Sequence, residues 1–296
     1  MQLLLRRFQG ALRGAAIGEA VAAARDRFTW QQVKSGQWHV EPQNWQQQWP
    51  QSRLLIAAVD RTIAHALNRP LDRSPTAEAR QPTSISRLDW LPIALFFHEN
   101  PMLLRQQIDR LTGQSDAIEQ ACILALSEAI ALALREELLI DQLLPRLSES
   151  VAPVSPIVSN QLLQVQAWLE AEASLVAVER SLAKRPVSLA RFSLGLYGWL
   201  STPQDFNLAL LRMQRFDAAV WLGALAGAYQ GMSGIAIDWW QPFTSSAVHH
   251  TWQTEILAPI DWLAAELLAA WAGADANAYP RIDRVGIAAA GLIRPR

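Results

Sequence analysis

Two ridges of glycine constrain the fold of this chain more than any other feature of its sequence. Each ridge is a run of three glycines spaced four residues apart, one near the start of the chain and one late in it: Gly10, Gly14 and Gly18, then Gly223, Gly227 and Gly231. Glycine inside a helix costs about 1 kcal/mol relative to alanine, so three on one ridge indicate a very close backbone approach. The matching spacing predicts two helices packed tightly together along these ridges.

The periodicity of the remaining sequence is helical. Apolar residues recur at helical spacing over several segments, and we expect helices over residues 2–26, 52–68, 88–97, 101–111, 115–135, 137–147, 160–184, 188–200, 204–213, 216–231 and 253–272. We expect a loop over 151–159, and Ser201–Thr202–Pro203 should cap the helix that follows. No alternation of useful length suggests a strand. The sequence therefore predicts an all-α fold, with residues 1–296 forming a single domain.

Two segments interrupt the helical pattern. Residues 28–50 are rich in glutamine and tryptophan and are expected to form a long, partly ordered loop, which in a compact domain is often functional. Residues 70–86 are rich in Pro, Ser, Thr and Arg and are expected to be a surface linker within the domain.

Composition excludes several classes of protein. Hydrophobic residues make up 51% of the chain and charged residues 18%, which suits a large core and not disorder. The net charge of −1 gives no attraction to nucleic acid. Cys122 has no second cysteine to pair with, so we expect a cytoplasmic, reducing environment. Residues 218–237 are uncharged and long enough for a membrane span, but their glycines and Gln230 favour a buried helix.

Tryptophan is unusually abundant, with thirteen in the chain. Four of them fall within the loop, at positions 30, 38, 45 and 49. They could form a stacking surface for a planar ligand or a partner protein, or they could cover the core beneath the loop, which we favour. Trp239, Trp240 and Trp252 could form a second apolar surface.

The sequence shows few of the polar motifs that catalysis requires. Metal sites need clustered carboxylates, histidines or cysteines, and the sequence has no Asp-rich loop and no histidine pair four residues apart. It has no glycine-rich phosphate loop following a strand. No Ser/His/Asp set is evident, although such a set is defined in space and not in sequence.

Four segments carry a resemblance to a known family. Residues 7–20 read Arg-Phe-Gln-Gly-Ala-Leu-Arg-Gly-Ala-Ala-Ile-Gly-Glu-Ala, which resembles the opening helix of the ADP-ribosylglycohydrolase family. Residues 219–231 resemble the late helix of that family, and residues 89–96 its Pro-Ile-Ala-Leu segment. Leu111-Thr112 is similar to its Leu-Thr-His stretch, with Gly113 in place of histidine. The similarity spans about residues 7–240 and implies an all-α, orthogonal multi-helix bundle.

The resemblance also implies chemistry whose motifs are missing here. Members of the family hold two divalent cations, usually Mg²⁺, and release ADP-ribose from modified proteins or small molecules. Their early metal motif, Thr-Asp-Asp-Thr, falls at residues 50–53, so Gln51 and Ser52 stand where aspartates belong. The late motif falls at residues 213–217, where Gln214 and Phe216 occupy the two aspartate positions and Asp217 comes one residue late. Glu19 replaces the aspartate of the opening helix.

These departures suggest a cleft without a metal. Mg²⁺ prefers anionic oxygen ligands, and Arg53 and Arg215 would repel a dication if they pointed inward. Pointing inward, they could instead bind a diphosphate or a carboxylate; otherwise the cleft is closed and both arginines are solvated. We expect no catalytic residue, no bound metal and no cofactor, and a ligand-binding cleft lined by Glu19, Trp49, Gln51, Ser52, Arg53, Gln214, Arg215, Phe216 and Asp217.

The sequence therefore predicts a catalytically inactive relative of the ADP-ribosylglycohydrolases. It would bind an unknown protein partner or a small ligand resembling ADP-ribose through the cleft and the Trp-rich loop. One alternative is an active hydrolase of ADP-ribosyl bonds whose metal ligands are displaced to Glu19, Asp60, Asp89, Asp205 and Asp217. Another alternative is a structural subunit or assembly factor of a larger complex.

Overall fold

The fold was analysed in a computed structural model of the chain, which describes residues 2–24, 49–66, 87–213, 218–236, 239 and 250–274. Within these ranges the regular structure is helical and contains no strand, so the expected all-α class is confirmed. The expected surface linker at 70–86 and the expected Trp-rich loop, apart from Trp49 and Pro50, lie outside the described residues.

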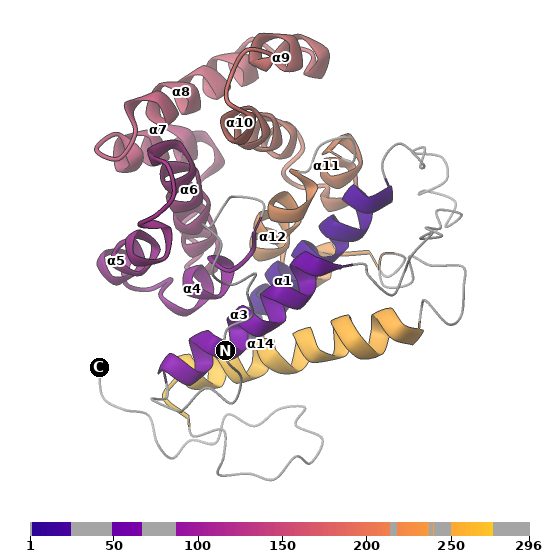
Figure 1. The fold of residues 1–296 in the computed structure, drawn as a ribbon. Helices are drawn as coiled ribbons and strands as arrows, with labels where there is room; N and C mark the ends of the chain where they lie inside the picture. The colour runs from indigo at the N-terminus through magenta and orange to yellow at the C-terminus, as the bar shows by residue number, and fades with distance from the viewer. Residues whose placement is uncertain are drawn as a thin grey trace.

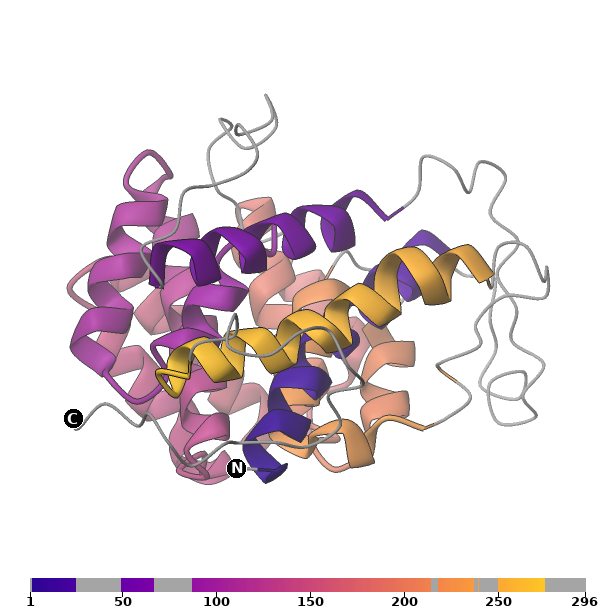
Figure 2. The same cartoon turned by 90° about the horizontal axis from the view of Figure 1, so that it is seen from below.

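Two groups of helices lie on either side of α12 (Figure 1). Helices α5 to α9 gather on one side of it, and α1, α3 and α14 lie together on the other, an arrangement that Figure 2 shows from below. The described helices, in chain order, are α1 (Gln2–Ala24), α3 (Pro50–Ala66), α4 (Leu91–Phe96), α5 (Pro101–Thr112), α6 (Ala117–Leu134), α7 (Ile140–Val151), α8 (Pro156–Glu170), α9 (Leu175–Leu182), α10 (Val187–Leu200), α11 (Phe206–Met213), α12 (Ala219–Gln230) and α14 (Ala258–Trp271). A 3₁₀ turn, η3 (Met232–Gly234), follows α12, and a π-helix, η5 (Trp252–Leu257), leads into α14.

The two glycine ridges lie against each other where α1 crosses α12. A Cβ atom on Gly14 would overlap the carbonyl oxygen of Gly223, and one on Gly10 would overlap that of Gly227. The pairing is offset at both ends, because Gly18 meets the backbone of Ala219 and Gly231 lies across from Gly10. The two helix backbones therefore touch without any intervening side chain.

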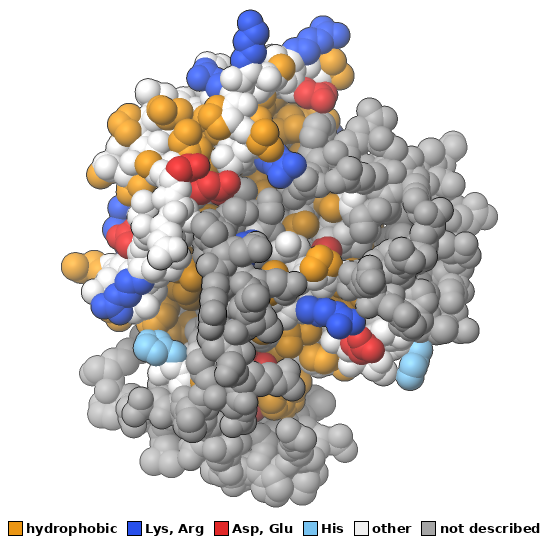
Figure 3. All heavy atoms as spheres, viewed as in Figure 1, with side chains coloured by type: hydrophobic (Ala, Val, Ile, Leu, Met, Phe, Trp, Pro, Cys, Tyr) orange, Lys and Arg blue, Asp and Glu red, His pale blue; other side chains and the backbone are white. Residues whose placement is uncertain are grey.

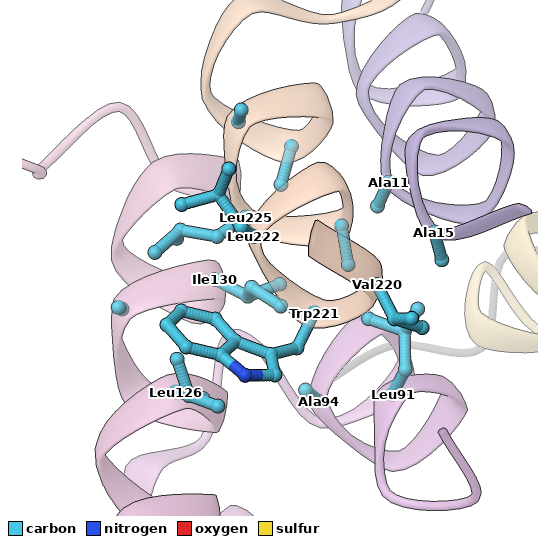
Figure 4. Close-up of a cluster of buried hydrophobic side chains, with 14 of the residues drawn as sticks. Ala11, Ala15, Leu91, Ala94, Leu126, Ile130, Val220, Trp221, Leu222 and Leu225 are labelled. Carbon is cyan, nitrogen blue, oxygen red and sulfur yellow. The ribbon is translucent and has the colours of Figure 1, made fainter. Parts of the chain in front are cut away.

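The core on the other side of α12 is built around Trp221. Its indole ring packs near Leu126 and Ile130 of α6 and near Ala94 of α4 (Figure 4). A Cβ atom on Gly195 of α10 would overlap the same ring. Three elements distant in sequence therefore close around one large side chain, which is only 1% exposed.

The expected buried helix at the start of residues 218–237 is confirmed, since every residue from Ala219 to Ala228 is buried. It is too short to span a membrane, because α12 ends at Gln230. Among the described helices, α6 alone is long and apolar enough by composition to cross a bilayer, and 72% of it is buried inside the protein. That degree of burial is what a central core helix requires.

One predicted helix is two in the structure. Residues 160–184 were expected to be continuous, but α8 ends at Glu170 and α9 begins at Leu175. Glu172 adopts a left-handed conformation with φ of 47°, and the Ser174 hydroxyl caps α9 by accepting from the amide of Ala177. The loop expected over 151–159 is also shorter, because Pro156 begins α8 at a position that needs no amide hydrogen.

The expected cap of α11 is wrong. The helix begins at Phe206, and the carboxylate of Asp205 accepts from the amide of Leu208 at 2.9 Å. The hydroxyls of Ser201 and Thr202 instead donate backwards to the carbonyl of Gly198. A carboxylate at the positive end of the helix serves better than the predicted Ser-Thr-Pro sequence.

Replacing Gly227 with leucine should abolish cooperative folding, and so should Gly14→Leu, because either side chain would have to displace a helix backbone. Circular dichroism during thermal unfolding would measure this. Gly113→Ala is the matched control, since the nearest atom to its new Cβ would lie at 3.3 Å; its free energy of unfolding should stay within about 1 kcal/mol of the unmodified protein. A Gly227→Leu protein with a normal transition would contradict the packing.

Candidate functional site at the N-terminus of α3

A buried carboxylate from α1 binds the first turn of α3. Glu19 is 7% exposed, and its two oxygens accept from the amides of Gln51 and Ser52, both at 2.8 Å. The Ser52 hydroxyl donates a third bond at 2.5 Å. First-turn amides have no partner within their own helix, so Glu19 caps α3 from a different helix.

The environment of Glu19 acts on its ionisation in two directions. Burial raises the pKa of Glu19 above its ordinary value, because a desolvated carboxylate is less stable as an anion. The hydrogen bonds from Ser52 and from the Gln51 amide lower the pKa, though by less than burial raises it. The positive end of the helix dipole also favours the anion.

The residue before α3 is strained and buried. Trp49 has φ of 65°, a left-handed conformation that bulky residues rarely adopt. Its ring packs against Trp252, the first residue of η5, with ring centroids 5.0 Å apart. Such strain persists only where the surrounding packing dictates it, and here the indole contact holds Trp49 in place.

Of the tryptophans singled out above, the three that the structure describes belong to the core. Trp49, Trp239 and Trp252 are 2%, 1% and 0% exposed, respectively. The burial of Trp49 agrees with the favoured alternative, in which tryptophans cover the core, and Trp239 and Trp252 add no exposed apolar surface. Trp30, Trp38, Trp45 and Trp240 lie outside the described residues.

The side chain of Arg53 points towards solvent. Its side chain is 52% exposed and pairs with the equally exposed Glu255 of η5 at 2.9 Å. This matches the solvated alternative for Arg53. Arg215, Gln214, Phe216 and Asp217 lie outside the described residues. The face shown in Figure 3 intersperses apolar and charged side chains over the described helices.

The described carboxylates that could have formed a displaced metal site do not gather into one. Asp89 pairs with Arg87 at 3.1 Å, Asp205 caps α11, and Asp60 is exposed on α3. Within the ranges that the structure describes, no group of three or more His, Cys, Asp or Glu side chains could hold a metal ion. Of the expected site residues, the structure brings together Glu19, Trp49, Gln51, Ser52 and Arg53.

The chain matches a known protein family. The family model described as ADP-ribosylglycohydrolase matches residues 1–277. The chain belongs to the ADP-ribosylglycohydrolase family. No curated protein matches the chain. Because the match covers both glycine ridges, the contact between α1 and α12 lies within the region that matches the ADP-ribosylglycohydrolase family.

Sequence reasoning identified Glu19 as a substituted residue but missed its role as a cap. One signal could have revealed it. The residue before Pro50 is a tryptophan, which has no acceptor for the open amides of α3, so the acceptor had to come from elsewhere. The pairing of Arg53 with Glu255 was also missed, because it joins residues far apart in the chain.

Trp252→Ala should destabilise the protein by about 3 to 5 kcal/mol, because it leaves a cavity beside Trp49. Arg53→Ala, at the same end of α3, should cost less than about 1 kcal/mol, since both partners of its ion pair are half exposed. Chemical denaturation of the two variants would measure the difference. Equal losses would show that Trp49 does not depend on Trp252 for its packing.

Proposed function

We propose that this chain is a catalytically inactive member of the ADP-ribosylglycohydrolase family that acts as a binding module. The observation that carries the proposal is the bonding of Glu19 to the first turn of α3. In the family, this turn holds the early metal motif. Here its open amides are already bound by a carboxylate of the protein.

The donor atoms at this turn do not fit two divalent cations. Gln51 and Ser52 offer neutral oxygens, and the carboxylate of Glu19 already accepts three hydrogen bonds. Mg²⁺ prefers several anionic oxygens in near-octahedral geometry. The late motif adds glutamine and phenylalanine at its two aspartate positions. We therefore propose no metal-dependent step for this chain.

The ligand that we propose is a small molecule with a diphosphate, resembling ADP-ribose. Arg53 stands at the rim of the turn, half exposed, and among the described residues its guanidinium is held by a surface ion pair. Such a pair contributes little, so exchanging Glu255 for a phosphate costs little. A guanidinium binds phosphate through two parallel hydrogen bonds. A protein partner is the alternative that the test below separates.

Calorimetric unfolding with ADP-ribose should raise the melting temperature by a few degrees, equally with Mg²⁺ and with EDTA. A ligand at about one hundred times its dissociation constant adds roughly 2.7 kcal/mol. Arg53→Ala should reduce the shift, whereas Arg146→Ala, which removes a surface arginine from α7, should not. A shift that requires Mg²⁺ would support the active hydrolase. No shift under any condition would leave a protein partner as the ligand.

A further inference from the structure

We infer that Glu19 is a built-in anionic ligand for the N-terminus of α3, and that it fastens α3 to α1 where the family's motif holds divalent cations. This inference rests on the proposed absence of a metal site, and it assigns that organising role to one residue of the chain. It is a positioning role: Glu19 acts on the placement of α3 and contacts no substrate.

The length of the Glu19 side chain lets its carboxylate reach the first turn of α3. The corresponding position in the family's opening helix is aspartate, which is one methylene shorter than glutamate. In this chain the longer side chain places both carboxylate oxygens 2.8 Å from backbone amides of α3. A shorter carboxylate on the same backbone would be withdrawn from these amides.

Among the described residues, Glu19 provides the side-chain cap of α3. Trp49 precedes the helix and has no side-chain acceptor, and Pro50 supplies no amide. The next two amides, of Gln51 and Ser52, are the ones that Glu19 binds. Ser52 is fully buried, so with Glu19 in place its amide depends on the carboxylate and not on bulk water. Buried donors without acceptors are costly, so α3 depends on Glu19 to begin where it does.

Contacts with α12 and α14 hold α1, the helix that carries Glu19, in place. One side of α1 is in backbone contact with α12 through the glycine ridges. Arg13, which lies between Gly10 and Gly14 on α1, donates to Asp261 of α14 from Nε at 2.6 Å. Glu19 is thus presented by a helix that cannot shift, which is what a fixed ligand for another helix requires.

Glu19→Ala should lower the melting temperature by about 5 °C or more in EDTA, because the buried amide of Ser52 and the partly buried amide of Gln51 lose their acceptor. The matched control is Glu255→Ala, which removes the surface ion pair at the same end of α3 and should shift the midpoint by less than about 2 °C. The substitution deletes the equivalent of one acetate ion. Acetate should therefore raise the melting temperature of Glu19→Ala more than that of the unmodified protein, and chloride at equal ionic strength should not.

Hydrogen exchange on the unmodified protein provides a test that does not need a folded variant. The amides of Gln51 and Ser52 should exchange more slowly than the first-turn amides of α8, for which Ser155 provides no side-chain cap. Glu19→Gln keeps the side chain's shape but replaces one acceptor oxygen with an NH2 donor, so it should reduce that protection at one of the two amides.

Three results would overturn the inference. They are unprotected amides at Gln51 and Ser52, a Glu19→Ala midpoint equal to that of Glu255→Ala, and Mg²⁺ stabilisation of the unmodified protein that Glu19→Ala abolishes. The third would make Glu19 a metal ligand. None of these readouts uses ADP-ribose, so a failure to bind ADP-ribose would count against the proposed ligand and leave the role of Glu19 standing.

Discussion

The direct backbone contact between α1 and α12 is the constraint on which the rest of the structure depends. Because Gly14 and Gly223 have no side chains, the two helices approach until their backbones touch. Any side chain at the crossing would separate them and open the core around Trp221, which α12 carries on its opposite side. Close packing of this kind tolerates little change in volume. The position of α12, and with it the contacts of α4, α6 and α10, is therefore set by an apolar contact of very small residues.

On the other side of α1, polar groups fix the positions of α3 and α14. Apolar packing is non-directional, so by itself it does not fix how far α3 and α14 slide along their neighbour. Arg13 meets Asp261 of α14, and Glu19 meets the first turn of α3. Both groups on α1 are largely withdrawn from water, where an unpartnered charge would be costly. Each bond is therefore satisfied in only one register of the helices.

The extent to which sequence predicted this structure follows from the range of the interactions. The helices and the glycine contact follow from periodicity and spacing, which are local properties. The break between α8 and α9 was missed because residues 171–174 contain neither glycine nor proline. The contact of Trp49 with Trp252 was missed because the two residues are distant in sequence and Trp252 lies in a π-helix. The role of Glu19 was missed for the same reason, since its acceptor oxygens serve a helix that begins after a long intervening segment.

The scaffold and the metal chemistry of this family depend on different residues, which is why one can be present without the other. The glycine ridges need only backbone proximity and make no use of a cation. The first turn of α3 is where the two requirements meet, because its open amides and positive helix end need an anionic partner whatever the chemistry nearby. With Gln51 and Ser52 in the motif, that turn supplies no carboxylate of its own. Glu19 supplies it from α1 through hydrogen bonds from the amides of Gln51 and Ser52, so this carboxylate holds α3 in its place in the bundle.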